Sequence, residues 1–242
     1  MTNTTKSVDI VAALSECASR ADACTKCEIS KTRDKMVFAD GNPLARIMIV
    51  GEGPGETEDR TGIPYVGPAG DLLDKMLASI GLNRTSVYIA NVIKCRASEY
   101  AGYVKNRPPT RDEAANCSEY LLEQIRLVSP DVILATGAPA AKALIGDPNF
   151  AITRQRGKWY QGPYGIPTLV TFHPAYILRL RSDELQKAKM LVWTDLKALR
   201  ARLDGDDIDL VGGRPDCTEA HHRAAPAHTL RTIEKRLQPQ LF

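Results

Sequence analysis

Apolar and polar positions alternate along this chain in blocks rather than residue by residue. Four short blocks are almost wholly apolar, and a glycine or a polar residue comes within two positions after each of them. These blocks are residues 46–51, 87–93, 131–136 and 167–171. A strand without polar positions on alternate sides is covered on both faces, so the pattern predicts buried strands of a parallel sheet.

Segments with helical apolar spacing lie between and around these blocks. The expected helices cover residues 8–18, 70–80, 110–128, 138–145 and 182–203. Gly81 is a typical stop for the second of them, and Thr110 with Glu113 forms a capping box at the start of the third. Residues 150–164 are predicted to form a loop or hairpin. Strands that alternate with helices indicate an α/β fold, with helices on both faces of one parallel sheet.

The composition is that of an ordinary globular protein, with 242 residues, 43% hydrophobic and 25% charged. Residues 1–203 are predicted to form one domain that begins with a metal-binding segment. From residue 204 the chain turns polar, so residues 204–242 are predicted to be a disordered tail, with a short helix near residues 229–237. Neither a long apolar run nor an export signal is present, which predicts a cytoplasmic protein without a membrane partner.

The charge balance is nearly even, with 32 Lys and Arg against 29 Asp and Glu, a net charge of +3. This value is too small to identify a nucleic-acid-binding protein by itself, but it permits a local basic face. Cationic residues gather in the later half of the chain, at Arg154, Arg156, Lys158, Arg179 and Arg181.

Four of the six cysteines have a spacing that indicates a metal site. Cys24 and Cys27 form a Cys-x-x-Cys pair, Cys95 follows the second predicted strand, and Cys117 lies in a predicted helix. Thiolates from such distant segments can hold either an iron–sulfur cluster or a structural zinc ion, and spacing alone does not separate these two. Cys17 lies outside this set and is predicted to be an ordinary helix residue.

Polar residues follow the predicted strands at the edge where open α/β sheets build their sites. The turn 52–55 follows the first strand, Asn91 lies near the end of the second, Gly137 follows the third, and His173 follows the fourth. The glycine-rich turn 51–55 lacks the spacing of a dinucleotide-binding fingerprint, although its N–H groups suit a phosphate or a polar ring. A buried amide at Asn91 requires hydrogen-bond partners, which a ligand can supply.

Several motifs together resemble the family 4 uracil-DNA glycosylases, the iron–sulfur class. The matching stretches are GEGPGETEDRTGIPYVGPAG (51–70), YIANVIKCR (88–96), DVILATGAPAAKALIG (131–146), ITRQRGKWY (152–160) and FHPAYILR (172–179), together with the CTKC and ANC segments. The resemblance implies a three-layer α/β/α sandwich with a central four-stranded parallel sheet. It also implies one [4Fe–4S] cluster, no divalent metal for the chemistry, and removal of uracil from DNA in base excision repair.

Site residues carry over where this chain matches the family motifs. The four cysteines Cys24, Cys27, Cys95 and Cys117 match the cluster ligands, and the cluster is expected to be structural. The expected catalytic residues are Glu52, Glu58 and His173. His173 would stabilise the leaving uracil, and Glu58, with Glu52 as the alternative, would position the water.

The expected contacts with the substrate follow from the same match. The base is expected to lie against Gly53, Gly55, Tyr65 and Asn91, with Asn91 reading its polar edge. Tyr65 stands where the family usually has a phenylalanine as the stacking ring. DNA contacts are expected from Tyr176, Ile177 and Arg179, with Leu178 beside them, and the partner is uracil-containing DNA, single- or double-stranded.

Other readings remain open. A related branch crosslinks itself to DNA through a histidine in an inserted loop, but residues 98–110 contain no histidine, which favours turnover. The spacer 96–116 is longer than is typical of the family. An iron–sulfur nucleic-acid-binding or redox-sensing protein that kept the fold without the chemistry is the main alternative, and a zinc-stapled hydrolase is a weaker one. The protein is expected to be a monomer.

Overall fold

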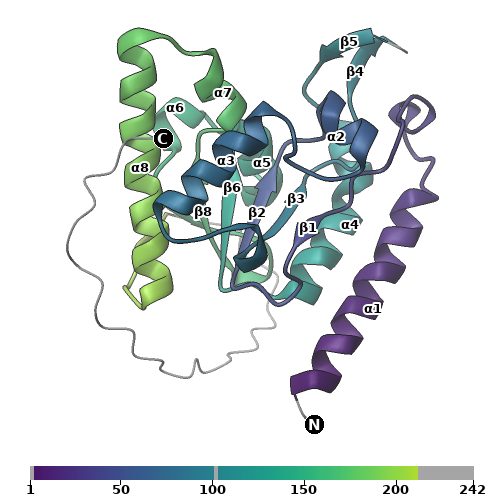
Figure 1. Ribbon diagram of the computed structural model, residues 1–242, viewed down its shortest axis with the longest axis horizontal. Coiled ribbons are helices and arrows are strands. Elements are labelled where there is room, and N and C mark those ends of the chain that lie inside the picture. Colours follow the sequence, from purple (N-terminus) through teal and green to yellow (C-terminus); the bar gives the residue numbers. More distant parts are fainter. Residues whose placement is uncertain (1–2, 101–102, 212–242) are drawn as a thin grey trace.

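A computed structural model describes residues 3–100 and 103–211, and these residues build one central sheet (Figure 1). Its middle consists of the four predicted strands, β2 (Ile47–Gly51), β3 (Tyr88–Asn91), β6 (Val132–Thr136) and β8 (Pro167–Thr171). They are parallel and lie in the order β3-β2-β6-β8. The predicted four-stranded parallel arrangement is therefore confirmed.

The sheet is wider than the sequence predicted. The strand β1 (Asp40–Gly41) pairs antiparallel with β3, and β7 (Trp159–Gln161) pairs antiparallel with β8. The strand β9 (Leu210–Val211) pairs parallel with β7, so ordered sheet continues into the segment predicted as a tail. The rest of that tail, with its predicted helix near 229–237, lies outside the described residues.

Alternate residues of each strand face opposite layers of the molecule. Met48 and Val50 of β2 belong to a core cluster with α4 (Arg111–Val128) and α5 (Ala138–Ile145). Ile47 and Ile49 belong to a second cluster with α3 (Pro68–Ser79) and α8 (Ser182–Asp204). Because both faces of the sheet are apolar, both are covered by helices, and the predicted three-layer sandwich is confirmed.

The first helix, α1 (Asn3–Asp22), is longer than the predicted 8–18 and packs against α4 (Figure 1). Cys17 and Ala21 of α1 form a small cluster with Tyr120 of α4, so Cys17 behaves as the buried helix residue that the sequence predicted. This packing brings the chain that follows α1, with Cys24 and Cys27, beside the body of the domain.

Shorter elements complete the fold. They are η1 (Glu28–Lys31), α2 (Glu56–Thr61), η2 (Arg84–Ser86), the hairpin of β4 (Ser98–Tyr100) and β5 (Tyr103–Asn106), α6 (Ile152–Gln155), η3 (Pro163–Gly165) and α7 (Pro174–Arg179). The capping box predicted at α4 is present, since Thr110 Oγ1 accepts the Glu113 N–H at 3.2 Å and Glu113 Oε2 accepts the Thr110 N–H at 2.8 Å.

The connection order places a topological switch at β2. From β2 the chain moves to β3 on one side of the sheet, and it later returns to β6 on the other side. Loops diverge at such a point and leave a crevice at the carboxyl ends of the strands. Within residues 3–100 and 103–211, no helix combines the length and the apolar content that a membrane span needs.

Candidate active site

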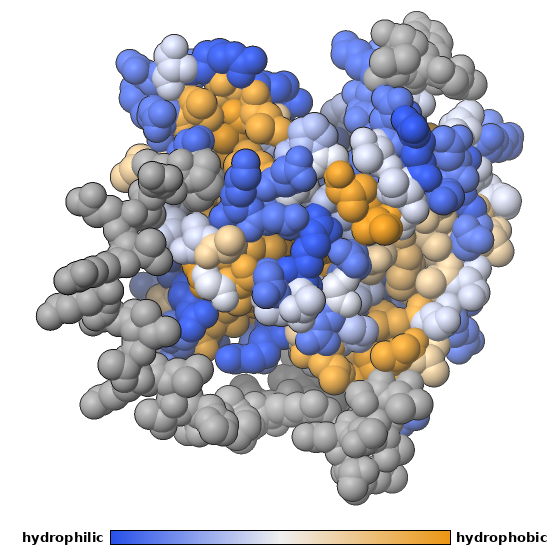
Figure 2. Space-filling model, in the orientation of Figure 1, coloured by the Kyte–Doolittle hydropathy of each residue, from blue (hydrophilic) through white to orange (hydrophobic). Residues whose placement is uncertain are grey.

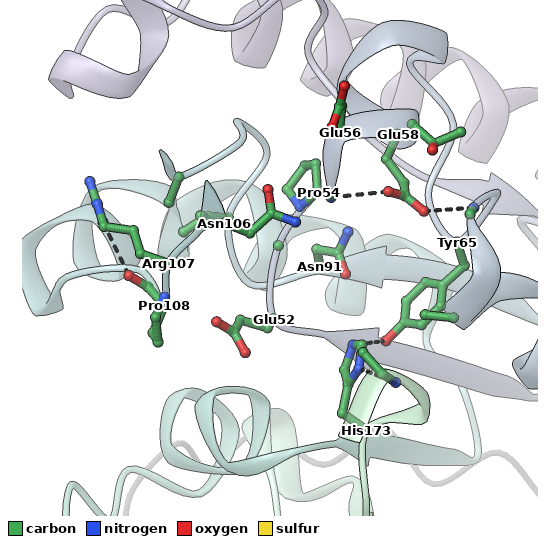
Figure 3. A pocket seen from close by; sticks show the side chains of 18 of the residues that line it. Glu52, Pro54, Glu56, Glu58, Tyr65, Asn91, Asn106, Arg107, Pro108 and His173 are labelled. Carbon is green, nitrogen blue, oxygen red and sulfur yellow. Dashed lines mark hydrogen bonds between the residues drawn. The ribbon is translucent and has the colours of Figure 1, made fainter. Parts of the chain in front are cut away.

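A cavity of about 600 Å³ opens at this switch point (Figure 3). Its floor comes from the loop after β2 and from the ends of β3 and β8, and its walls come from α7 on one side and from the residues that follow β5 on the other. The predicted catalytic and base-binding residues all line it, namely Glu52, Gly53, Gly55, Glu58, Tyr65, Asn91 and His173. The volume suits one small ring-shaped group together with part of the molecule that carries it.

His173 is the N-cap residue of α7, and its imidazole is held in one tautomer. Its Nδ1 accepts the backbone N–H of Ala175 at 3.1 Å, so in the neutral ring the proton must be on Nε2. Burial, and to a smaller extent the charge of Arg179, lower the pKa of His173 to about 4. The side chain is therefore a neutral hydrogen-bond donor near pH 7.

The ring of Tyr65 lies against that of His173, with centroids 5.5 Å apart and an angle of 27° between the planes. Its hydroxyl lies 3.1 Å from His173 Nε2 (Figure 3). The same hydroxyl lies 2.7 Å from Thr136 Oγ1. Burial raises the pKa of Tyr65, so the phenol stays protonated. The sequence predicted Tyr65 as a stacking face but gave no sign of its contact with the imidazole.

The backbone at Tyr65 has a φ of 56°, in the region that side chains other than glycine seldom adopt. Arg84 stabilises this conformation, since its guanidinium donates to the carbonyls of Pro64 and Tyr65. Gly70 lets the Tyr65 carbonyl lie close to the start of α3, because a Cβ at Gly70 would overlap that carbonyl. The loop around Tyr65 is thus held from two sides.

Gly51, the last residue of β2, was not singled out by sequence reasoning except as part of a turn. A Cβ at this position would overlap both the Tyr65 hydroxyl and Asn91 Oδ1. The absence of a side chain at Gly51 therefore lets these two groups reach the same cavity floor. A glycine that directly follows a fully apolar strand is the signal that the sequence offered.

Asn91 is 3% exposed and lies at the end of β3. Its backbone is fixed, because its carbonyl accepts the Lys94 ammonium at 2.9 Å. Within the part of the chain that the structure describes, the side-chain amide makes no hydrogen bond, and it faces the cavity. Its donor and its acceptor are both available to a ligand.

The two glutamates of the first motif have different surroundings. The Glu58 carboxylate accepts the backbone N–H groups of Gly55 at 3.0 Å, Val66 at 3.1 Å and Gly67 at 2.9 Å. Those three bonds join two loops and use most of its acceptor capacity. The sequence preferred Glu58 for positioning water, and this geometry argues against that choice.

The carboxylate of Glu52, unlike that of Glu58, is not bonded by any backbone N–H group that the structure describes. This carboxylate makes no hydrogen bond within the described ranges and lies in the cavity (Figure 3). Burial raises the pKa of Glu52, and the nearby charge of Arg179 lowers it. Glu52 is therefore the cavity carboxylate that is free to bind a water molecule.

The residues after His173 divide between the core and the rim of the cavity. Ile177 is 1% exposed and packs in the core below α7, which corrects its predicted role in DNA contact. Tyr176 is half-buried against Phe172, with ring centroids 4.9 Å apart. Leu178, 42% exposed, and Arg179, also exposed, line the cavity. The apolar side chain at the rim is that of Leu178.

The opposite wall comes from the last residue of β5 and the chain that directly follows it. Asn106, Arg107, Pro108 and Pro109 line the cavity there. Arg107 is held in an ion pair with Glu113 at 2.6 Å, so it is not a free cation. Figure 2 shows the surface hollowed between this wall and the wall formed by α7. The sequence identified this spacer as long but did not place it at the site.

The four cysteines of the predicted metal site converge from separate elements. Cys24 follows α1, Cys27 precedes η1, Cys95 follows β3, and Cys117 lies in α4. All four are free thiols. Burial raises the pKa of Cys95 and brings that of Cys117 to about 11; Cys24 and Cys27 add to the first increase, and Cys95 and Cys27 add to the second.

Comparison with known proteins decides the family. Residues 38–197 match the model of the Uracil DNA glycosylase superfamily. The chain belongs to this superfamily. It is 45% identical over 171 residues to a type-4 uracil-DNA glycosylase of Thermotoga maritima, which covers 69% of this chain and 84% of that relative.

Two further relatives have the same type-4 description. That of Archaeoglobus fulgidus is 42% identical over 162 residues, 64% of this chain and 78% of the relative. That of Pyrobaculum aerophilum is 40% identical over 162 residues, 64% of this chain and 80% of the relative. The resemblance stated from the motifs is thus confirmed at the level of the family.

Donors around the cysteines in this uracil-DNA glycosylase family member fit an anionic metal–thiolate group. Arg33 Nη1 donates to Cys95 Sγ at 3.1 Å, and Asn116 Nδ2 donates to Cys27 Sγ at 3.3 Å. Lys94, 1% exposed, bonds two neutral acceptors, and the charges that favour its protonated form are those of Cys117, in the set, and Cys17, outside it. Such N–H···S contacts are typical of iron–sulfur sites.

Across the described ranges, no group of three or more histidine, cysteine or acidic side chains is arranged to hold one metal ion. Four cysteine ligands serve an iron–sulfur cluster and a structural zinc ion alike, so this arrangement does not separate the two.

Proposed function

We propose that this protein is a uracil-DNA glycosylase that hydrolyses the N-glycosidic bond of deoxyuridine in DNA and leaves an abasic site for base excision repair. One observation carries the proposal: a neutral imidazole donor, an unpaired amide and an unpaired carboxylate line one cavity at the switch point of the sheet. The type-4 relatives, named for this activity, support it.

Recognition of the base is assigned to Asn91. Uracil inside a duplex is out of reach, so the nucleotide is extruded into the cavity or taken from a single strand. The Asn91 amide then accepts from uracil N3–H and donates to O4. Cytosine offers an amine and a bare nitrogen at these places, and both contacts fail. Thymine is refused by shape, through the turn from Gly53 to Gly55 that Glu58 holds closed.

Cleavage is assigned to His173 and Glu52. As the bond breaks, negative charge develops on uracil N1 and O2, and positive charge develops on the sugar. The Nε2–H of His173 donates to O2 without a change of protonation state, because the ring is neutral beforehand. Glu52 positions the attacking water and stabilises the cationic sugar by its charge.

The rim of the cavity is assigned to the DNA strand. Leu178, with Tyr176 behind it, fills the space that the extruded base leaves in the stack. Arg179 contacts a neighbouring phosphate. These contacts involve one strand, so both single- and double-stranded DNA serve as substrate, and a monomer suffices.

The four cysteines are assigned to a [4Fe–4S] cluster that attaches the segment after α1 to α4 and to the end of β3. A hydrolysis requires no electron, so the cluster supplies structure and not redox chemistry. No divalent metal has a part in the proposed reaction.

The proposed function is tested with a uracil-containing oligonucleotide and no added metal. We expect alkali-labile abasic sites at uracil, and none in matched oligonucleotides with thymine or cytosine at that position. Repeated turnover with excess substrate distinguishes an enzyme from the self-crosslinking alternative, which stops at one equivalent. Binding without release of uracil would contradict the proposal and favour the nucleic-acid-binding alternative.

Substitution of a cluster ligand tests the structural role. Cys95→Ser is expected to lose iron and visible absorbance together with thermal stability, because the segment after α1 is then no longer held. Iron content, absorbance and thermal unfolding measure this. Cys17→Ala, which changes a buried cysteine outside the set, is the control and is expected to keep its iron. A colourless Cys95→Ser protein with unchanged stability and activity would refute the role.

Replacing each of the two glutamates by glutamine distinguishes their roles. Glu52→Gln is expected to lower the single-turnover rate by roughly 10²-fold with little change in stability, because it removes the group that holds the water. Glu58→Gln is expected instead to lower stability by about 1–3 kcal/mol, because an NH₂ group then faces a backbone N–H. Single-turnover kinetics and thermal unfolding measure the two effects, and the opposite assignment follows if the effects are exchanged.

A further inference from the structure

Four hydrogen bonds connect the catalytic imidazole to the interior of the sheet. The N–H of Ala175 bonds His173 Nδ1 at 3.1 Å, and His173 Nε2 lies 3.1 Å from the Tyr65 hydroxyl. That hydroxyl lies 2.7 Å from Thr136 Oγ1, and Thr136 Oγ1 donates to the Val50 carbonyl at 3.2 Å. Thr136 is fully buried, and Tyr65 is 4% exposed.

The two ends of this chain fix the direction of every bond in it. The N–H of Ala175 can only donate, and the Val50 carbonyl can only accept. The Thr136 hydroxyl therefore donates its one hydrogen bond to the Val50 carbonyl, and its oxygen must accept a hydrogen bond from the Tyr65 hydroxyl. The tyrosine oxygen must in turn accept the Nε2 proton of His173. The reverse direction would place an Nδ1 proton against the N–H of Ala175.

We propose that Thr136 is a positioning residue for His173 and acts through the Tyr65 hydroxyl; this inference rests on the proposed function. Because Thr136 accepts the hydrogen bond of the Tyr65 hydroxyl, a lone pair of the tyrosine oxygen faces Nε2. The imidazole, whose Nε2–H tautomer the Ala175 N–H already sets, is then held in place while the cavity is empty. When uracil enters, its O2 replaces the tyrosine oxygen as the acceptor of the hydrogen bond from Nε2–H, and the ring needs no change of tautomer.

Other parts of the structure support a role beyond packing. The Tyr65 loop is held in its positive-φ conformation by Arg84, which keeps the hydroxyl aimed at His173. Gly51 has no side chain at the point where a Cβ would displace that hydroxyl. If Thr136 had only a structural role, its hydroxyl would matter for stability and not for the chemical step.

A double-mutant cycle tests the inference. Thr136→Val keeps the shape and removes the hydroxyl, and Tyr65→Phe keeps the ring and removes the link. Each is expected to lower the single-turnover rate of uracil release about tenfold, with affinity for an oligonucleotide carrying a non-hydrolysable deoxyuridine analogue within about twofold. The double variant is expected to be no slower than Tyr65→Phe alone, because the two residues act in one chain.

The control variant is Thr136→Ser, which keeps the hydroxyl and is expected to retain the wild-type rate. Nitrogen-15 NMR of the His173 ring supplies a readout that packing alone does not move. Both proteins are expected to show the Nε2–H tautomer, because the Ala175 N–H remains, and in Thr136→Val the Nε2 proton is expected to exchange with water faster than in the wild type. Independent, additive losses in the cycle, or a wild-type rate and spectrum in Thr136→Val, would overturn the inference.

The two failures are distinguishable. If the wild type releases no uracil, the proposed function fails, and the NMR spectra of the same variants still report whether Thr136 holds the His173 ring in place. If Thr136→Val does not fold, Tyr65→Phe carries the test alone, since it breaks the same chain in a protein that keeps the Thr136–Val50 bond. An unchanged rate and an unchanged exchange of the Nε2 proton in Tyr65→Phe would then overturn the inference.

Discussion

Replacing Asn91 by aspartate is expected to remove most of the preference for uracil over cytosine. The carboxylate cannot donate to uracil O4, but it accepts from the cytosine amine, so the change weakens one substrate and favours the other. A site built to bond one polar edge discriminates by about 10⁴-fold against a mismatched one, so the ratio of rates can fall by that order. Single-turnover rates on uracil- and cytosine-containing oligonucleotides measure this ratio.

The control for this prediction makes the same chemical change elsewhere. Asn149→Asp alters an exposed residue that does not line the cavity, and it is expected to leave the ratio unchanged. Selectivity that survives in Asn91→Asp would remove Asn91 from the reading role, even if the overall rate falls.

Replacing His173 by alanine is expected to lower the rate of bond cleavage by about 10²–10³-fold. The loss arises because the donor to uracil O2 is removed from a buried site, where water replaces it poorly. Binding to the analogue oligonucleotide is expected to change little, since the phosphate contact of Arg179 remains. Single-turnover kinetics and equilibrium binding measure the two effects, and an almost unchanged cleavage rate would refute the anion-stabilising role.

The pH dependence of the wild type checks the same role. The active form of His173 is neutral, and its pKa is about 4 in the folded protein against an ordinary value of 6.5. Its donor function is thus retained as the pH falls through 6.5, and a fall in rate centred there would contradict a neutral donor. The unfolded chain binds more protons than the folded one between these two values, so this group also lowers stability as the pH falls from 6.5 to 4.

The elements that the sequence predicted well are those that local pattern determines. The strands β2, β6 and β8 agree within one residue with their apolar blocks, because a buried parallel strand has no polar positions. The helix α4 begins where Thr110 and Glu113 cap it. The motif residues meet in one cavity because parallel strands share a carboxyl edge, a consequence of connection order that alternating elements already imply.

Tertiary structure decided what each of these side chains does. The sequence offered Glu58, with Glu52 as the alternative, and only the folded loops show that the Glu58 carboxylate is bonded by three backbone N–H groups while that of Glu52 is free. Ile177 and Leu178 are neighbours, and the direction of a short helix sends one into the core and the other to the rim. These outcomes depend on contacts between distant segments, which local sequence patterns do not encode.

The same distinction explains the chain from His173 to Val50. Its members lie far apart in the sequence, and each has an ordinary local reading: a loop tyrosine, a strand threonine and a loop histidine. By itself, the sequence determined the alternating elements, the edge at which the polar residues meet and the family. Only the packed structure decided which donors and acceptors satisfy one another, because hydrogen-bond direction depends on which groups meet in three dimensions.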